Sequence, residues 1–379
     1  MNRPAFLDDP ALVSVLDALP EARVVGGAVR DALAGQPVSD IDLATPRPPD
    51  EVTRALAAAG VRAVPTGIDH GTVTAIADGR PFEVTTLRRD LDTDGRWAVV
   101  SFTDDWREDA NRRDFTINAM SMARDGRLFD YFGGATDLRG GRVRFVGEPA
   151  RRIAEDYLRV LRFFRFFARY GRGEPDAATL AALADGVPGL GRLSPERVWS
   201  ELKRILLAPD PDRALTLMER LGISCAVLPE VAVARRVARL PADPVLRLAA
   251  LRPDDPESLA DRLRLAGAER ERLRALQAPP LDAAASDDDL RRALDGTSAD
   301  ILADRVRLAA GPPDLIARLR AVPAPVFPLS GRDLQAQGVA PGPAMGAMLR
   351  ELRCWWRAGG CTADREEVLR ELARRLKHC

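Results

Sequence analysis

Histidine and cysteine are scarce in this sequence. The chain holds two histidines, His70 and His378, and none of its four cysteines forms a Cys-x-x-Cys pair. Zinc centres need several closely spaced His, Cys or acidic ligands, and disulfide frameworks need paired cysteines. The scarcity therefore argues against a zinc site, an appended His-Asp phosphohydrolase domain and a disulfide-stapled secreted domain. The cysteines are Cys225, Cys354, Cys361 and Cys379.

Long apolar runs are also missing. No stretch approaches the roughly 20 apolar residues that span a bilayer, and the first ten residues carry acids and prolines rather than a basic and then apolar leader. These features predict a cytoplasmic protein without a membrane partner. The 379 residues exceed one ordinary domain and indicate two or three packed units.

Lysine is nearly absent, and the formal net charge is zero. Only Lys203 and Lys377 are lysines, so arginine carries almost all positive charge and a single arginine is weak evidence for any role. Residues 142–172 differ, because they hold nine arginines and three acids. A stripe that faces phosphates is one interpretation of this segment.

Strand and helix patterns alternate up to about residue 147. A mixed α/β head is expected from these patterns, with hairpins around 78–79 and 125–126. After Pro149, which suits a helix N-terminus, the pattern is helical to the end, and one long helix is expected over 150–170. The further elements expected in the head are strands at 23–25 and 40–44 and helices at 28–34 and 49–59.

Two acids stand two residues apart in the short strand expected after residue 39. Side chains at this spacing point to the same face of a strand, so Asp40 and Asp42 converge while Ile41 packs behind them. Two close carboxylates repel unless a cation lies between them, and Mg²⁺ favours a few carboxylates together with substrate phosphates. Taken alone, the pair reads more simply as solvated acids at a strand end.

A glycine pair changes that interpretation. Gly26 and Gly27 lie between a strand and a helix, where the backbone N–H groups can approach a phosphate. Arg30, one turn into the helix, can reach the same anion. A tight strand–helix turn is the alternative explanation of the glycines.

Together these residues form Gly-Gly-x-x-Arg-Asp…Asp-x-Asp, which resembles the first motif of the class II tRNA nucleotidyltransferase and bacterial poly(A) polymerase family, in the DNA polymerase β superfamily. Four further segments resemble the later motifs in the same order. They are Arg112 to Met120, Phe129 to Leu138, Glu155 to Arg165, and Leu193 to Arg197. A tail element common in bacterial members resembles Ser330 to Leu334 with Pro341 to Pro343.

The resemblance implies an α/β nucleotidyltransferase head followed by an all-α neck, body and tail. We expect a catalytic head at 1–147, a base-recognising neck at 148–215, and a tRNA-binding body and tail at 216–379. The implied activity is addition of C, C and A to the tRNA 3′ end from CTP and ATP. Asp40 and Asp42 would bind Mg²⁺, and Gly27, Arg30 and Arg113 would contact the triphosphate and sugar of the nucleotide.

The neck would choose the base. Asp156 and Arg159 are expected as i, i+3 neighbours on one helix, where a surface ion pair is the alternative. Cytosine and adenine each offer an amino donor beside a ring-nitrogen acceptor, which an Asp and an Arg can satisfy. Guanine and uracil present the reverse pattern and would leave buried groups unpaired. By resemblance, Arg162 and Arg165 also contact the nucleotide.

Several alternatives stay open from the sequence. Glu83 is either a third acid of the site or a hairpin surface charge. The phenylalanines at 163–164 and 166–167 are expected to pack in a core rather than stack on bases, and Trp355-Trp356 likewise. By resemblance, the connection over 92–106 corresponds to a flexible loop of the full CCA-adding members, and its full length disfavours an enzyme that adds only CC; an ordinary surface connection is the alternative. A poly(A) polymerase, a CC- or A-adding enzyme and a non-catalytic RNA-binding protein remain the competing functions; the oligomeric state is not predicted.

Overall fold

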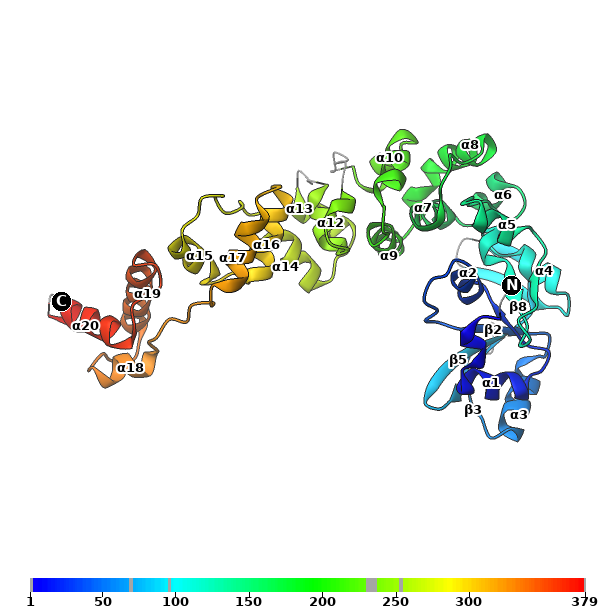
Figure 1. The fold of residues 1–379 in the computed structure, drawn as a ribbon, viewed down its shortest axis with the longest axis horizontal. Helices are drawn as coiled ribbons and strands as arrows, with labels where there is room; N and C mark the ends of the chain where they lie inside the picture. Colours follow the sequence, from blue (N-terminus) through cyan, green and yellow to red (C-terminus); the bar gives the residue numbers. More distant parts are fainter. Residues whose placement is uncertain (1–2, 68–70, 95–96, 230–236, 252–254, 378–379) are drawn as a thin grey trace. The chain divides into compact units, whose positions relative to one another are not determined.

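The computed structural model describes residues 3–67, 71–94, 97–229, 237–251 and 255–377, with the side chains of 90–100 left out. His70, His378 and Cys379 therefore lie outside the described residues. The chain divides into two compact units, Met1–Ala238 and Arg239–Cys379 (Figure 1). The expected boundaries between head, neck and body, at 147/148 and 215/216, do not coincide with the boundary between these units and stay a prediction.

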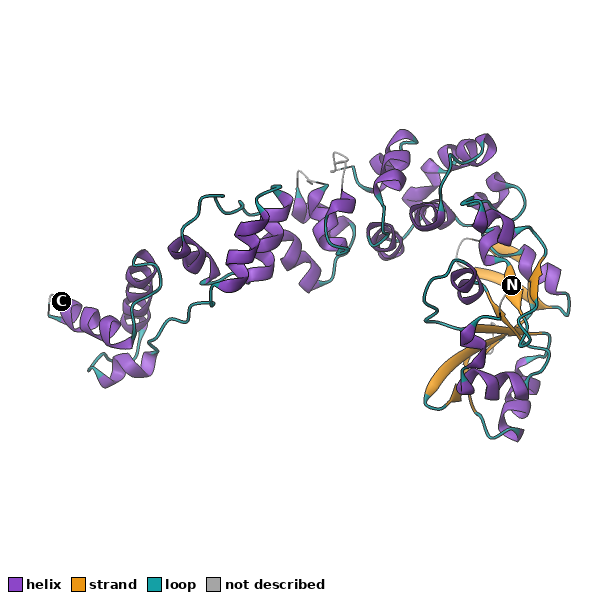
Figure 2. Ribbon diagram, in the orientation of Figure 1, coloured by secondary structure: helices purple, strands orange, loops and turns teal. Residues whose placement is uncertain are grey.

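Unit 1 begins with a mixed sheet, whose strands are orange in Figure 2. The sheet has seven strands in the order β3-β4-β5-β2-β1-β8-β9. Strands β2 and β5 run parallel, whereas β2 pairs with β1 in antiparallel fashion. The site strand β2 is thus central in the sheet. The strands are β1 (Arg23–Val25), β2 (Asp42–Thr45), β3 (Arg62–Gly67), β4 (Thr72–Ala77), β5 (Arg80–Thr86), β8 (Met120–Met122) and β9 (Leu128–Asp130).

Helices pack on this sheet and complete the predicted α/β head. Strand β4 alternates half-buried and buried residues, as expected for a strand with one face against helices. Helices α1 and α3 contact β4, and α2 contacts β1 and β8. Both expected hairpins, β4–β5 and β8–β9, are present. The helical elements of the head are η1 (Ala5–Asp8), α1 (Pro10–Ala18), α2 (Gly27–Leu33), α3 (Pro49–Ala58), α4 (Trp106–Asn111), η3 (Thr116–Asn118) and α5 (Gly134–Arg139).

The connection expected as a flexible loop at 92–106 is mostly regular. Strands β6 (Arg88–Asp94) and β7 (Trp97–Phe102) pair antiparallel in a separate two-stranded sheet, and α4 follows. The loop prediction was wrong because the charged run from Arg88 to Asp94 hides the strand: it lies outside the main sheet and needs no alternating apolar face.

The neck differs from the single helix expected over 150–170. It consists of α6 (Pro149–Glu155) and α7 (Leu158–Tyr170), separated at Asp156, whose backbone is extended with φ −156° and ψ 110°. The Asp156 carboxylate accepts the backbone N–H of Leu158 at 3.0 Å. This local side-chain bond competes with the helical pattern and starts α7 anew.

The four phenylalanines of α7 are buried, which confirms the core interpretation. Phe163 stacks on Phe145 of the head with ring centroids 6.0 Å apart, so the neck helix is anchored to the head by aromatic packing. The remaining elements of unit 1 are α8 (Ala177–Asp185), η4 (Val187–Arg192), α9 (Pro195–Leu206), α10 (Asp212–Arg220) and α11 (Ile223–Val227), with η5 (Val237–Arg239) at the boundary.

Unit 2 is helical, as expected. It contains two apolar clusters, one around Leu302 and Leu319 and one around Trp356, which is buried. Trp355 packs half-buried against the second cluster, so the tryptophan pair is largely core. Among the described residues, no helix is long and apolar enough to cross a membrane. The helices are α12 (Pro244–Ala250), α13 (Pro256–Arg262), α14 (Gly267–Leu276), α15 (Asp287–Leu294), α16 (Ala299–Leu308), α17 (Pro313–Ala321), α18 (Gly331–Ala336), α19 (Pro343–Ala358) and α20 (Arg365–Leu376).

Candidate active site

A polar cavity of about 710 Å³ lies in unit 1 between the head and α7. Its walls come from the glycine turn, the start of β2, the segment after α4, and the neck. Every residue predicted for the site lines this one cavity. They are Gly27, Arg30, Asp40, Asp42, Arg113, Asp156, Arg159, Arg162 and Arg165.

The two acids reach the cavity from the entry of β2. The strand begins at Asp42, two residues later than expected, so Asp40 lies in the preceding segment. Ile41 between them is buried, and both carboxylates line the cavity. The two carboxylates therefore line the same cavity although Asp40 is not part of strand β2.

The acids sit in an environment that disfavours two negative charges. Burial raises the pKa of Asp42, the charges of Glu83 and Asp40 raise it further, and Arg113 opposes them. A divalent cation between the carboxylates would relieve this repulsion. Glu83 is the register partner of Asp42 on β5, but it is not among the residues that line the cavity.

The donor set at β2 is small but suits Mg²⁺. Among the described residues, no group of three or more His, Cys, Asp or Glu side chains is arranged to hold a metal. Mg²⁺ commonly takes one or two carboxylates, substrate phosphates and water. Asp40 and Asp42 meet that pattern once a triphosphate is present, so the residues fit the ion.

The glycine turn is shaped by an arginine from the second motif. Gly26 has φ +66°, a conformation that favours glycine, and a Cβ there would lie 2.9 Å from Arg113 Nη1. Arg113 Nη2 donates to Asp109 Oδ2 at 3.2 Å. Burial would raise the pKa of Asp109, but Arg112 and Arg113 hold it below the usual value. Asp109 thus holds Arg113 over the turn, a role the sequence did not reveal.

Arg30 is fixed on the other side of the turn. Its Nη1 donates to Asn118 Oδ1 at 2.6 Å, and its Nη2 donates to Asp31 Oδ2 at 3.0 Å. Asn118 in turn donates to Asp114 Oδ1 at 3.0 Å. The chain of bonds joins α2 to the second motif, so the arginine keeps one orientation at the cavity wall.

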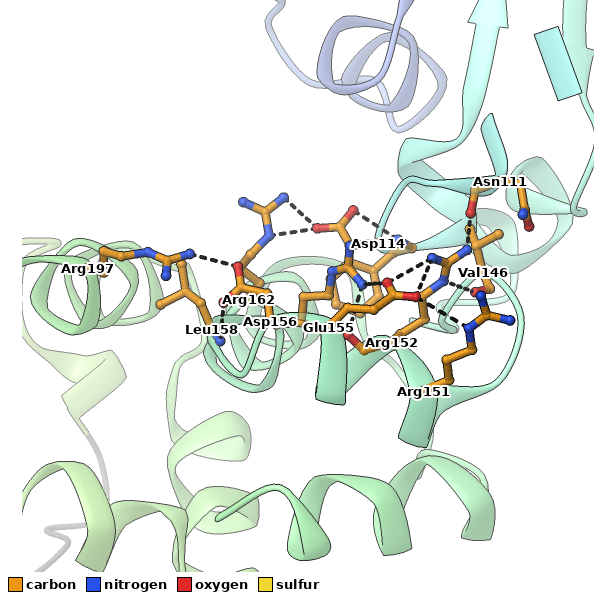
Figure 3. A network of polar contacts seen from close by, with 12 residues as sticks. Asn111, Asp114, Val146, Arg151, Arg152, Glu155, Asp156, Leu158, Arg162 and Arg197 are labelled. Carbon is orange, nitrogen blue, oxygen red and sulfur yellow. Dashed lines mark hydrogen bonds and ion pairs between the residues drawn. The ribbon is translucent and has the colours of Figure 1, made fainter. Parts of the chain in front are cut away.

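Asp114 carries this chain onward to the neck (Figure 3). Arg162 Nε donates to Asp114 Oδ2 at 2.7 Å. Burial would raise the pKa of Asp114, but the charge of Arg162 and the hydrogen bonds from Asn118 and Arg162 outweigh it, leaving the pKa lowered. Asp114 is therefore an ionised, buried link between head and neck.

Replacing Asp114 with asparagine should cost roughly 2 to 3 kcal/mol of unfolding free energy at neutral pH, because Arg162 loses its buried partner. A carboxylate with a lowered folded-state pKa stabilises the protein above its unfolded pKa of about 4. That stabilisation is lost as the pH falls through the lower folded-state value. Urea midpoints of Asp114→Asn and the parent should therefore differ at pH 7, begin to approach one another below about pH 4, and meet only below the lowered folded-state pKa; a pH-independent gap would contradict the assignment.

Among the described residues, the side chains of Asp156 and Arg159 bond to different partners rather than to one another. Asp156 Oδ2 accepts from Arg197 Nη2 at 2.7 Å, whereas Arg159 Nη1 donates to Glu155 Oε2 at 2.5 Å. The expected i, i+3 placement on one helix was wrong, because α7 begins only after Asp156. Separate anchors leave each side chain with unused hydrogen-bonding capacity at the cavity.

Arg162 and Arg165 share a buried acid that the sequence did not single out. Glu201 on α9 lies 3.2 Å from Arg165 Nη1 and 4.0 Å from Arg162 Nη1. Burial lowers the pKa of Arg165 to about 10, while Glu201 opposes the shift, so the guanidinium stays charged at neutral pH. Much of the basic stripe at 142–172 is thus matched by buried acids. A carboxylate at a helix position facing the core gives no distinct sequence signal.

Two family models match parts of this sequence. Residues 22–144 match the family described as "Poly A polymerase head domain", and residues 174–235 match "Probable RNA and SrmB- binding site of polymerase A". The chain is 38% identical over 371 residues to the Mus musculus protein "CCA tRNA nucleotidyltransferase 1, mitochondrial", covering 92% of this chain and 86% of the relative.

Solved structures agree in fold. The Bacillus stearothermophilus CCA-adding enzyme in complex with CTP matches with a TM-score of 0.80 and 25% identity over 100% of both chains. The Thermotoga maritima CCA-adding enzyme complexed with tRNA matches with a TM-score of 0.63 and 21% identity, covering 99% of this chain and 97% of that one. The chain belongs to the class II CCA-adding enzyme and poly(A) polymerase family, whose nucleotidyl transfer typically uses a divalent metal.

Proposed function

We propose that this chain is a CCA tRNA nucleotidyltransferase that adds C, C and A to the tRNA 3′ end from CTP and ATP, with Mg²⁺ held by Asp40 and Asp42. The observation that carries the proposal is the single cavity. It gathers two carboxylates, a glycine turn with two anchored arginines, and the Asp and Arg that would read the base.

The reaction forms a bond from the RNA 3′ oxygen to the α-phosphorus of the nucleotide and breaks the bond from that phosphorus to pyrophosphate. Asp40 and Asp42 would hold Mg²⁺, which would supply activation of the 3′ hydroxyl, whose proton goes to solvent, and neutralisation of the leaving pyrophosphate. Arg30 and Arg113 orient the triphosphate on either side of Gly27. The cavity-lining residues that the structure describes include no histidine, which suits a reaction without a protein general base.

Base choice falls to Asp156 and Arg159. The carboxylate would accept the amino group of cytosine or adenine, and the guanidinium would donate to the neighbouring ring nitrogen. Arg197 and Glu155 each hold one of the two side chains. A protein edge of this kind replaces a nucleic-acid template, and it rejects guanine and uracil because their reversed pattern leaves buried groups unpaired. Arg162 and Arg165 would supply further nucleotide contacts.

The remaining parts of the chain would bind the tRNA. The head would comprise 1–147, the neck 148–215, and the tRNA-gripping body and tail 216–379. Residues 174–235 match a family that is described as a probable RNA-binding site, which supports an RNA contact that begins in the neck. We propose the cytoplasm as the compartment from the sequence alone; the mouse relative is named as mitochondrial.

A poly(A) polymerase of the same family is the second candidate, because it would share the head motifs. Partial enzymes that add only CC or only A are variants of the first. The β6–β7 hairpin occupies the segment whose full length disfavours a CC-only enzyme. A non-catalytic RNA-binding protein is disfavoured by the intact acids and glycine turn.

An incorporation assay separates these functions. Purified protein is given CTP or ATP with tRNA ending before the CCA, after C, or after CC. We expect CTP addition to the first two ends, ATP addition to the third, and termination after A. A long tail made from ATP alone would identify a poly(A) polymerase, a halt after CC or a reaction restricted to the last A would identify a partial enzyme, and no incorporation at all would overturn the enzymatic proposal.

A further inference from the structure

Tyr170, the last residue of α7, reaches from the neck to the head. Its side chain is buried, and its hydroxyl accepts the Nε–H of Arg30 at 3.0 Å. The same hydroxyl donates to the carboxylate of Asp31. Arg30 and Asp31 belong to α2, directly after the glycine turn. The Tyr170 hydroxyl therefore bonds both to Arg30, which lines the cavity, and to Asp31, the acid that pairs with Arg30.

The bonds around Arg30 leave two N–H groups for a ligand. A guanidinium has five N–H donors. Tyr170 and Asp31 share Nε–H, Asn118 takes one hydrogen of Nη1, and Asp31 takes one of Nη2. The Nη2 group lies beside the glycine turn, because a Cβ placed on Gly27 would be 3.6 Å from it. A triphosphate oxygen at the turn would meet its unused hydrogen.

We propose that Tyr170 is a positioning residue, which holds Arg30 in the orientation that receives the triphosphate. The inference rests on the proposed function and deepens it. The helix that carries the base-reading Arg159 near its start fixes the triphosphate contact at its end. Base and triphosphate are thus held at a set spacing by one rigid element.

A second connection along α7 supports this arrangement. Arg162 bonds to Asp114, which bonds to Asn118, which accepts from Arg30. Arg30 is therefore tied to α7 at two points. Tyr170 lies 11 residues beyond Arg159, or about 16 Å along the helix. Loss of its hydroxyl should therefore disturb triphosphate binding and leave base choice intact.

The protonation state of the phenol suits this role. Burial raises the pKa of Tyr170, the bond to Asp31 and its charge raise it further, and Arg30 and Arg169 oppose them. The hydroxyl stays protonated at neutral pH, so it can donate to Asp31 while it accepts from Arg30.

Tyr170→Phe removes the hydroxyl and keeps the ring. We expect the KM for CTP and for ATP to rise about fivefold to tenfold, with the KM for tRNA and the preference for C and A over G and U unchanged. Tyr131→Phe is the matched control, because it removes a hydroxyl that accepts from Arg23 at 3.4 Å outside the cavity. A rise in the nucleotide KM in Tyr170→Phe and none in Tyr131→Phe is the expected result. Unchanged nucleotide KM values, or equal rises in both variants, would overturn the inference.

A double-mutant cycle tests whether Tyr170 acts through Arg30. The equilibrium binding of CTP and ATP is measured for Arg30→Gln, Tyr170→Phe and the double variant. If the phenol works only by holding the guanidinium, Tyr170→Phe should weaken binding in the parent and have no further effect beside Arg30→Gln. Additive effects would contradict the positioning role. Because binding needs no turnover, the cycle still decides the inference if the parent incorporates no nucleotide and the proposed function fails.

Discussion

Asp42→Ala is expected to lower the single-turnover rate of CTP incorporation about a thousandfold or more. The carboxylate is one of two groups that would hold the divalent ion, and such an ion contributes several kcal/mol of transition-state stabilisation. The fold should survive, because burial and the neighbouring acids raise the pKa of Asp42 and make its charge unfavourable without a cation. The measurement is a rapid-quench time course on tRNA that lacks its CCA end.

Two further variants serve as a control for Asp42→Ala and as a test of Glu83. Asp50→Ala removes an exposed acid of α3 that pairs with Arg54 on the surface, and it should retain full activity. Glu83→Gln decides the role of the third acid beside Asp42: a loss comparable to that of Asp42→Ala would make it part of the metal site, and full activity would make it a surface charge. Full incorporation by Asp42→Ala itself would refute the catalytic assignment.

Asp156→Ala should relax the choice of base more than it weakens nucleotide binding. The discrimination of CTP against UTP, measured as the ratio of kcat/KM values, is expected to fall about 10- to 100-fold, since each buried polar mismatch is worth about 1 to 3 kcal/mol. The KM for CTP should rise less. Single-nucleotide incorporation with all four triphosphates on the three tRNA ends provides the ratios.

The same substitution also removes the acceptor that starts α7, so its control must lose a helix cap elsewhere. Asp176 caps α8 by accepting the N–H of Thr179 at 2.8 Å, away from the cavity. Asp176→Ala should lower stability by about 1 kcal/mol and leave base choice unaltered. An equal loss of activity with all four nucleotides in Asp156→Ala would contradict base selection by this residue.

Local patterns were enough to predict the part of the head around the glycine turn. A strand, a glycine pair and a helix, followed by acids two residues apart, are determined by neighbouring residues, and the structure places Gly27 and Asp42 on one cavity as expected. Turn signals likewise located the β4–β5 and β8–β9 hairpins, whereas strand β3, which pairs with β4, was not predicted. Strand β6 escaped prediction because its charged sequence lacks the alternation that marks a strand packed on a core.

Contacts between distant residues explain the rest. The apolar periodicity runs without interruption through 150–170, and the break at Asp156 depends on a side-chain bond and on Arg197, 41 residues away. Tyr170 and Glu201 look like ordinary helix residues in the sequence. Their roles follow from the packing of α7 against α2 and α9, which no short pattern encodes.

The central claim is that Asp40 and Asp42 hold a divalent ion beside a triphosphate bound at the glycine turn. A crystal grown with Mn²⁺ and a non-hydrolysable CTP analogue, with data collected at the manganese edge, tests it most directly. The account predicts an anomalous peak within about 2.3 Å of both carboxylates, with phosphate oxygens at Gly27. A peak elsewhere, or a triphosphate bound away from the glycine turn, would contradict it.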